Sequence, residues 1–248
     1  MRIMLSKSSS ESIQVLNSNR NVIRSSTGGW RVGQGVYSHG YSMLDELVGE
    51  KSYFQLMILN ATGRLVDRRL ADWSEAMYGC LSWPDPRIWC NQIGALAGEA
   101  KTSVVAGTTA GIMAADSKMY GMYTILDGIA FIQSALEKTK NNQTPAEIVT
   151  DNIQKNRGKL NITGYVRPIA KGDERIETMQ RVSKHLQFDE GPHLLLAYQI
   201  ENQIKRRFNE GMNINGYVAA FFSDQGFSAD EVYQIFSTVV MSGVTACY

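Results

Sequence analysis

Two stretches of the sequence are the most informative about fold and function: TGYVRPIAKGDER, residues 163–175, and GMNINGYVAAFFSDQGF, residues 211–227. Two glycines and a proline interrupt regular structure in the first stretch, and helical segments separate it from the second. A charged stretch is most often a solvated loop. Here, however, the charges fall in one turn region between helices, which favours a functional site; they belong to Arg167, Lys171, Asp173 and Arg175.

The composition limits the classes of protein that fit. A chain of 248 residues, 44% of them hydrophobic, can bury the core of one large domain or of a large and a small one. A formal charge of +1 with 20% charged residues argues against a general binder of nucleic acid or of membrane surfaces, since either needs a basic surplus on one face.

The cysteines and the apolar segments indicate a soluble cytoplasmic protein. Cys80, Cys90 and Cys247 are an odd number without metal-ligand spacing, so we expect reduced thiols, no disulfide and no metal site. The first twelve residues lack the apolar run of a signal peptide. The segment 94–115 is interrupted by Glu99 and does not fit a membrane span.

Residues 1–35 are polar and predict an arm, in which TGGWRVGQG, residues 27–35, forms turns or short strands. From residue 41 the pattern is helical, with start and stop signals at regular intervals. Four positions carry these signals most clearly: Ser42 and Ser52 as caps, Pro145 as a first helical residue and Ser228 in a capping box.

About ten helices and no sustained strand alternation predict an all-α fold. We expect a large helical domain from residues 36–126 and 191–248, and a smaller, hinging lobe from residues 127–190. The small residues of segment 94–115 allow close backbone approach, which predicts a helix at the centre of the bundle or across a subunit interface.

Five segments, in order over roughly residues 38–248, resemble motifs of the citrate synthase superfamily, and especially of its short, citryl-CoA lyase-like members. HGYSMLDEL resembles an early RGY-x-IEEL block, and AGIMAADSKMYGM an AGI-x-A-x-x-GP-x-HGG turn. GYVRPIAKGDER is similar to the GFGHPVYK-x-DPR loop, and MNINGYVAAFF is similar to the NVD-x-x-x-A loop and helix. The last segment, FSTVVMSGVTACY, is similar to the closing motif F-x-x-AR-x-x-G-x-x-AH.

The resemblance implies an all-helical fold with a large and a small lobe, and a homodimer. It also implies chemistry on an acyl-CoA thioester, whose enolate attacks, or is released from, a keto-acid carbonyl. In the family a carboxylate takes the proton and two histidines polarise the carbonyl groups. No cofactor is implied beyond coenzyme A, which is part of the substrate.

This chain departs from the family at all three catalytic positions, which fall at Tyr120, Arg167 and Asn215. An amide has no useful basicity, so Asn215 cannot abstract a proton. Arg175 keeps the place of a carboxylate-binding arginine, whereas Val240 replaces a second one. The histidines lie elsewhere in the sequence and are expected to be structural or exposed: His39, His185 and His193.

Two functions stay open at this point. In the first, Tyr120 and Asn215 hydrogen-bond an enolate while the arginines hold a carboxylate. The enolate then arises from loss of carbon dioxide, from cleavage of a carbon–carbon bond, or through Tyr120 acting as a base with a pKa lowered by the arginines. In the second, the chain is an inactive homologue that binds an acyl-CoA, a carboxylate or a partner subunit.

The expected coenzyme A contacts follow from the resemblance and lie at Gly164, Tyr165, Val166 and Lys171. Other basic residues are available for its phosphates, among them Lys155, Arg157, Lys159 and the run at residues 205–207, although each is more often a solvated helix face. No glycine-rich phosphate-binding motif is present in the sequence.

Overall fold

The computed structural model describes residues 13–15, 17–18, 25–118, 120–167 and 171–248. The chain divides into two units, residues 1–51 and 52–248. Much of the predicted arm, and Pro168 in the charged loop, lie outside the described residues. No helix in the described ranges combines the length and the apolarity that a membrane crossing requires.

The first unit holds a small antiparallel sheet of β1 (Gly28–Arg31), β2 (Gly35–Ser38) and β3 (Tyr41–Ser42), in that order. A helical turn, η1 (Met43–Leu47), follows, and the Ser42 hydroxyl accepts from the Asp45 amide. The expected turns or short strands after residue 27 and the Ser42 cap are confirmed.

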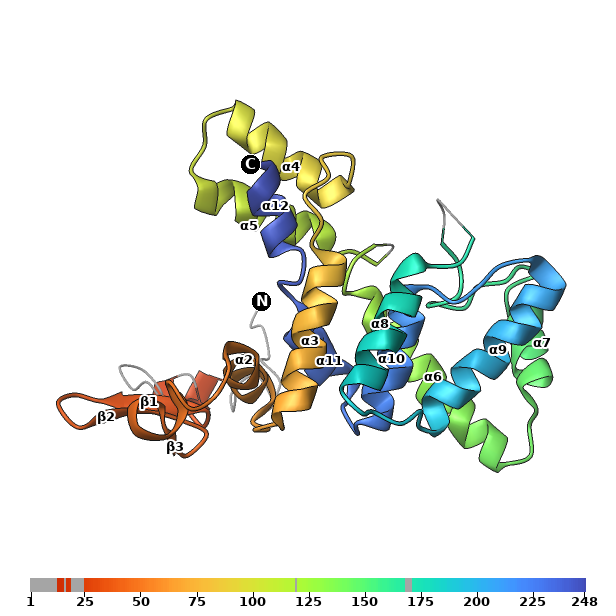
Figure 1. Cartoon of the computed structure of the whole chain (residues 1–248), viewed down its shortest axis with the longest axis horizontal. Coiled ribbons are helices and arrows are strands. Elements are labelled where there is room, and N and C mark those ends of the chain that lie inside the picture. Colours follow the sequence, from red (N-terminus) through yellow and green to blue (C-terminus); the bar gives the residue numbers. More distant parts are fainter. Residues whose placement is uncertain (1–12, 16, 19–24, 119, 168–170) are drawn as a thin grey trace, which may run out of the picture. The chain divides into compact units, whose positions relative to one another are not determined.

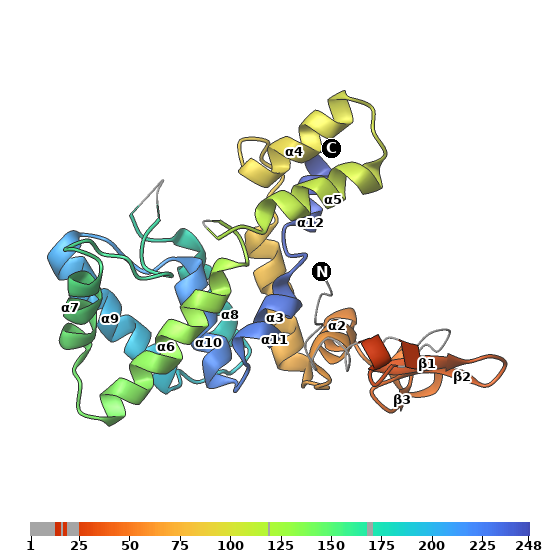
Figure 2. The same cartoon turned by 180° about the vertical axis from the view of Figure 1, so that it is seen from behind.

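The second unit is helical, as Figures 1 and 2 show, and confirms the all-α prediction. Its helices are α2 (Tyr53–Thr62), α3 (Arg68–Leu81), α4 (Trp89–Glu99), α5 (Val104–Ala115), α6 (Thr124–Lys140), α7 (Pro145–Lys155), α8 (Glu174–His185), α9 (Pro192–Phe208), α10 (Ile214–Asp224), α11 (Ala229–Phe236) and α12 (Met241–Cys247).

Local signals set several of these boundaries. Ser52 and Ser228 each form the reciprocal capping box of a helix N-terminus, and Pro145 is the first residue of α7. Gly63 ends α2 in the left-handed conformation, with φ of 75°. The three predictions at Ser52, Pro145 and Ser228 are confirmed because each depends only on residues within one helical turn.

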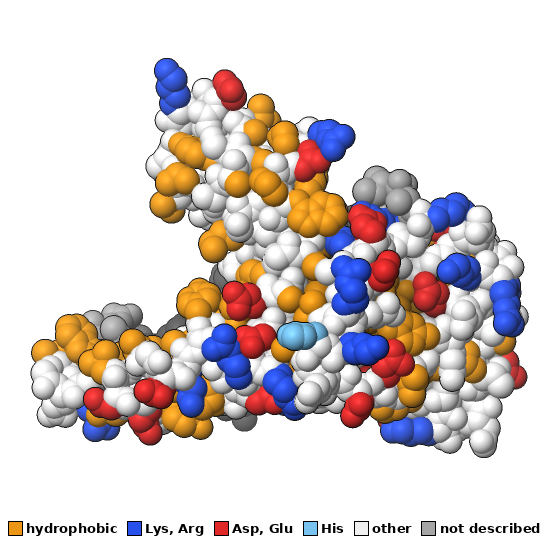
Figure 3. Space-filling model, viewed as in Figure 1, with side chains coloured by type: hydrophobic (Ala, Val, Ile, Leu, Met, Phe, Trp, Pro, Cys, Tyr) orange, Lys and Arg blue, Asp and Glu red, His pale blue; other side chains and the backbone are white. Residues whose placement is uncertain are grey.

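The small-residue segment forms two helices and not the single one that its composition predicted. Lys101, with φ of 56°, lies between α4 and α5. The glycines do permit close approach, and their neighbour is α12: a Cβ on Gly94 would lie 2.7 Å from the Val244 carbonyl oxygen. The module of α4, α5 and α12 therefore has its own small core, and Figure 3 shows hydrophobic side chains on its surface.

Helix α10 lies at the centre of the main core. Every residue from Gly216 to Ser223 is buried, and α10 packs against α6, α8 and α9. The Phe221 ring stacks on Trp73 at 3.9 Å between centroids, and the Trp73 indole donates to the Ser183 hydroxyl at 2.8 Å. This core fixes α3, α8 and α10 together, so the N-terminal end of α10 has a defined place. The hinging lobe of residues 127–190 stays a prediction.

Candidate functional site

The N-terminal ends of α6, α8 and α10 meet through two side chains. Asp173, the N-cap of α8, accepts the Ile214 amide of α10 at 2.9 Å, and its side chain is fully buried. The Asn215 amide nitrogen donates to the Thr124 hydroxyl at the start of α6. Three helix dipoles therefore bring their positive ends to one region, which favours negative charge there.

The loop at Gly164 is fastened to the same end of α10. The backbone amide of Asn213 donates to the Gly164 carbonyl, and its side-chain amide donates to the Val166 carbonyl, both at 2.8 Å. Gly164 has φ of 98°, and a Cβ there would lie 2.7 Å from the Gly216 Cα, so only glycine fits. Tyr165 is a core residue whose hydroxyl donates to the Ala197 carbonyl.

Both predicted arginines lie in this cluster, and both already bind carboxylates. Arg175 donates to Asp173 through Nε at 2.7 Å and Nη2 at 2.6 Å. Arg167 donates to Glu174 through Nη1 at 2.5 Å and Nη2 at 3.2 Å. The predicted role of the arginines in holding a ligand carboxylate therefore requires that one of these pairs open.

The arginines lower the pKa of the two carboxylates that they bind, Asp173 and Glu174. Burial acts to raise the pKa of Asp173, but the hydrogen bonds and charge of Arg175 outweigh it, so this pKa lies below its ordinary value. The hydrogen bond from Arg167 lowers the pKa of Glu174. Lys171 is more exposed and donates to the Asn209 carbonyl at 3.0 Å and to Glu210 at 3.3 Å.

The charge of Arg175 acts to lower the pKa of Tyr120, yet Tyr120 is a weaker acid than an ordinary tyrosine. Desolvation and the neighbouring Cys90 thiol raise the pKa of Tyr120 to about 12, against a smaller opposing effect of Arg175. The prediction of a Tyr120 pKa lowered by arginines is therefore wrong, because desolvation outweighs the charge. A neutral hydroxyl donates hydrogen bonds and does not serve as a base at neutral pH.

The orientation of the Asn215 amide follows from its neighbours. The Thr124 hydroxyl donates to the Gly121 carbonyl at 2.8 Å, so its oxygen must accept from Asn215. The Asn215 nitrogen therefore faces Thr124, while its oxygen makes no hydrogen bond to the described residues. Gly121 directly follows Tyr120, so this chain of contacts also ties Tyr120 to the start of α10.

Comparison of the chain with known proteins gives matches among solved structures alone. No protein-family model matches the chain, and no curated protein matches it. Citryl-CoA lyase from Hydrogenobacter thermophilus superimposes with a TM-score of 0.77 at 23% identity, over 91% of this chain and 85% of that one. This chain has the citrate synthase fold.

Two further structures with this fold carry bound ligands. ATP citrate lyase from Methanothrix soehngenii, in complex with citrate and coenzyme A, superimposes with a TM-score of 0.73 at 16% identity, over 100% of this chain and 41% of that one. Citrate synthase from Thermoplasma acidophilum, in complex with carboxymethyl coenzyme A and oxaloacetate, gives 0.61 at 17% identity, over 79% of this chain and 51% of that one.

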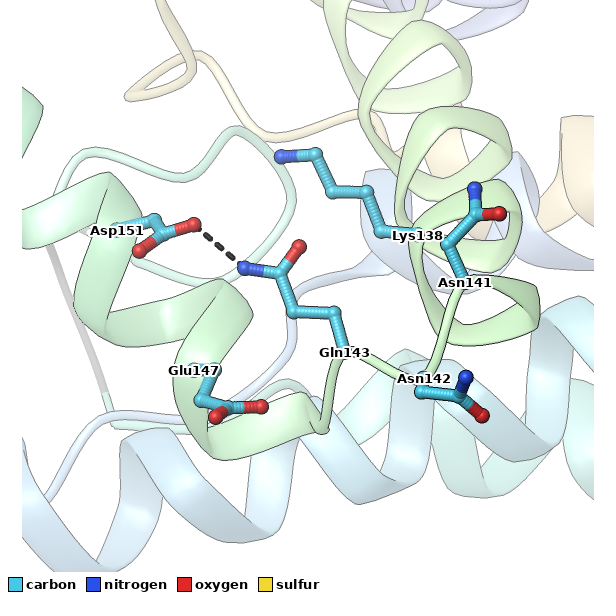
Figure 4. A pocket seen from close by; sticks show the side chains of 6 residues that line it. All are labelled: Lys138, Asn141, Asn142, Gln143, Glu147 and Asp151. Carbon is cyan, nitrogen blue, oxygen red and sulfur yellow. Dashed lines mark hydrogen bonds between the residues drawn. The ribbon is translucent and has the colours of Figure 1, made fainter.

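Arg167, Arg175 and Asn215 thus lie near the N-terminal ends of α8 and α10, which Asp173 joins, and Tyr120 directly precedes Gly121, whose carbonyl accepts from Thr124. Their roles stay predictions. Two surface pockets lie elsewhere. One of about 430 Å³ is lined by polar residues between α6 and α7, where Gln143 donates to Asp151 (Figure 4). The other, of about 470 Å³, lies between α3 and α8 beside His185.

One of the histidines, His193, lies far from the cluster. His193 pairs with Asp224 at 2.8 Å, at the C-terminal end of α10, whereas Asn215 lies near its N-terminal end. A helix of 11 residues separates its ends by about 16 Å. His193 caps nothing in the cluster and joins α9 to α10, which agrees with the expected structural role.

Three residues of the cluster were missed by sequence reasoning. Glu174 could have been found from the sequence, because it replaces the proline of the DPR motif that DER otherwise resembles. In the structure the Glu174 carboxylate binds Arg167. Thr124 and Cys90 carried none, since they meet Asn215 and Tyr120 only through the packing of distant segments.

Proposed function

We propose that this chain binds an acyl-CoA thioester together with a small keto acid or carboxylate, and makes or breaks a carbon–carbon bond between them. The observation that carries the proposal is the meeting of the N-terminal ends of α6, α8 and α10 on the citrate synthase fold, where Asp173 accepts the Ile214 amide and Asn215 donates to Thr124. The similar structures were solved with coenzyme A, its carboxymethyl derivative, citrate and oxaloacetate, which supports this class of ligand.

The chemistry must proceed without a basic side chain at Asn215 or Tyr120. A malonyl-type thioester loses carbon dioxide, and the electrons of the broken bond form the thioester enolate. Its carbon attacks the keto carbonyl, and the resulting alkoxide takes a proton from water. Neutral hydrogen-bond donors suit this route, because the Tyr120 hydroxyl and the second amide hydrogen of Asn215, whose first is donated to Thr124, stabilise negative oxygen without removing a proton.

A second function is favoured by the same two residues. With the pKa of Tyr120 at about 12 and an amide at Asn215, neither side chain abstracts a proton from an acetyl-type thioester near neutral pH. The alternative is therefore a binding protein that holds an acyl-CoA or a carboxylate, or that joins a catalytic partner, without turnover. Both functions require the same ligand site.

We also propose a homodimer built on the outer face of α5. Val105 is 72% exposed and Met113 70%, and their spacing of eight residues places them on one face. Gly107 and Gly111 take the opposite face, against Tyr248 and Val244 of the same chain. A second copy would cover the exposed apolar face. Three free thiols agree with the expected reducing cytoplasm.

The experiment is an assay of purified protein with acetyl-CoA, malonyl-CoA and 3-hydroxyacyl-CoA thioesters, with and without keto acids. Free thiol and carbon dioxide are measured, and binding is followed by calorimetry. Turnover of a malonyl-type or hydroxyacyl thioester supports the enzyme. Binding without turnover supports the alternative. Absence of both refutes the proposed function.

A further inference from the structure

The charged loop before α8 carries three cations, and each has a carboxylate partner. Arg175 pairs with Asp173 at 2.6 Å and Lys171 with Glu210 at 3.3 Å. Arg167 pairs with Glu174 at 2.5 Å and lies farther, at 3.8 Å, from Asp173. The described part of the loop and its partners therefore carry no net charge. A ligand carboxylate gains little from approaching this cluster unless it replaces one of the three partners.

The three pairs differ in how readily they open. Asp173 is fully buried and also accepts the Ile214 amide, so its removal from Arg175 would leave an amide and a guanidinium unsatisfied. Lys171 keeps a second bond, to the Asn209 carbonyl. Glu174, in contrast, is held by Arg167 alone among the described side chains and is 61% exposed, so it can swing into water.

We infer that the site binds, in addition to the thioester, a second ligand that carries a single carboxylate, such as a monocarboxylic 2-keto acid. Glu174 is the residue that sets this specificity. A ligand carboxylate exchanges one for one with Glu174 on Arg167, whose planar fork binds carboxylates through two parallel bonds. A second ligand carboxylate finds no exchangeable cation in the cluster. The inference rests on the proposed function and names the substrate class for it.

The inference sets this chain apart from proteins of similar fold that were solved with citrate or oxaloacetate, ligands with several carboxylates. In this chain the two arginines available in the described cluster are neutralised, one of them permanently by a buried partner. The second carboxylate of oxaloacetate would find Arg175 already held by Asp173. The repulsion between these two carboxylates offsets any attraction to that arginine.

The test is calorimetric titration of the wild type, Glu174→Gln and Glu177→Gln with pyruvate and with oxaloacetate, each in the presence of saturating acetyl-CoA. Glu177 is a matched control, because it lies one turn along α8 and, among the residues that the structure describes, pairs with Arg181 alone, at 3.6 Å. The wild type should bind pyruvate at least as tightly as oxaloacetate. Glu174→Gln should bind pyruvate about fivefold more tightly, since the competing carboxylate is gone, and Glu177→Gln should match the wild type.

Tenfold tighter binding of oxaloacetate than of pyruvate by the wild type overturns the inference. So does a Glu174→Gln protein that binds pyruvate no more tightly than Glu177→Gln, or a wild type that binds acetyl-CoA and neither keto acid. In the first two cases the proposed function survives, because a thioester and a keto acid still bind. In the third, binding of acetyl-CoA alone leaves only the alternative of a binding protein. A protein that binds neither acetyl-CoA nor a keto acid refutes both.

Discussion

The buried carboxylate of Asp173 holds Arg175 through two hydrogen bonds of 2.7 and 2.6 Å and, at the same time, accepts the Ile214 amide at 2.9 Å. One side chain thus caps α8, orients an arginine and fixes the start of α10. Because the three functions share one carboxylate, charge at the candidate site is coupled to the stability of the fold around it.

Replacement of this carboxylate should destabilise the protein. We expect Asp173→Asn to lower the free energy of unfolding by about 3 kcal/mol, as is typical when one partner of a buried ion pair is removed. Urea titration measures the change. Asp230→Asn, on the exposed first turn of α11, is the control and should change stability by less than about 0.5 kcal/mol. Equal stability of the two variants would contradict the role of Asp173.

The ion pairs of Asp173 and Glu174 with their arginines predict how the free energy of unfolding depends on pH. The folded-state pKa of Asp173 and that of Glu174 lie below their ordinary values. Their contribution is therefore complete above the unfolded pKa, near 4, and is lost as the pH falls through the folded pKa. Urea titrations at several pH values should show a decline below about pH 4 that is smaller in Asp173→Asn. An identical decline in the wild type and in Asp173→Asn would contradict a stabilising ion pair between Asp173 and Arg175.

Tyr120 should act as a neutral donor. With its pKa at about 12, any turnover should not rise between pH 7 and pH 10, as it would if a tyrosinate were the base. Tyr120→Phe should lower turnover by about 100-fold, the loss expected for one oxyanion-binding donor. Its affinity for the thioester should change by less than about threefold, which steady-state kinetics and calorimetry separate. A rate that climbs with pH and vanishes in Tyr120→Phe would restore the tyrosine as a base.

Asn215 marks the position at which a base is missing. We expect Asn215→Asp to exchange the methyl protons of acetyl-CoA with deuterated solvent, because a carboxylate at this position can remove a proton. Nuclear magnetic resonance follows the exchange. The wild type and Asn141→Asp, a control in the pocket between α6 and α7, should show none above background. Exchange by the wild type at the rate of Asn215→Asp would show that another base is present.

The close packing of α4 on α12 predicts how glycine substitutions change the stability of the protein. Gly94→Ala places a methyl group 2.7 Å from the Val244 carbonyl and should cost about 2 kcal/mol of stability. Gly79→Ala, on exposed α3 surface with nothing within 4 Å of the new Cβ, should stabilise by about 0.5 kcal/mol. Urea titration compares the two. A neutral Gly94→Ala would mean that α12 does not pack as described.

The sequence predicted the parts of this fold that depend on neighbours along the chain. Ser52, Pro145 and Ser228 begin helices where expected, since a cap needs only the next turn. The break at Lys101 was missed although it carries such a signal, since Ser103 caps α5 by accepting the Ala106 amide. The packing of α12, from the far end of the chain, against α4 and α5 carries no local signal.

The candidate site shows the same division. Tyr120, Arg167, Arg175 and Asn215 were named by resemblance, and their roles stay predictions. The structure links the two arginines to the start of α10 through Asp173. Their electrostatic states were not predictable. The pKa of Tyr120 depends on burial beside Cys90, and the state of Arg167 on Glu174, and both follow from how the segments pack.

The measurement that tests the central claim most directly is a crystal structure of the protein soaked with coenzyme A and pyruvate. The account predicts ligand density at the N-terminal ends of α6, α8 and α10, in contact with Tyr120 and Asn215 and with a carboxylate on Arg167 in place of Glu174. Density confined to the pocket beside Lys138, or to the one beside His185, would contradict it, as would an empty cluster in a crystal that binds coenzyme A elsewhere.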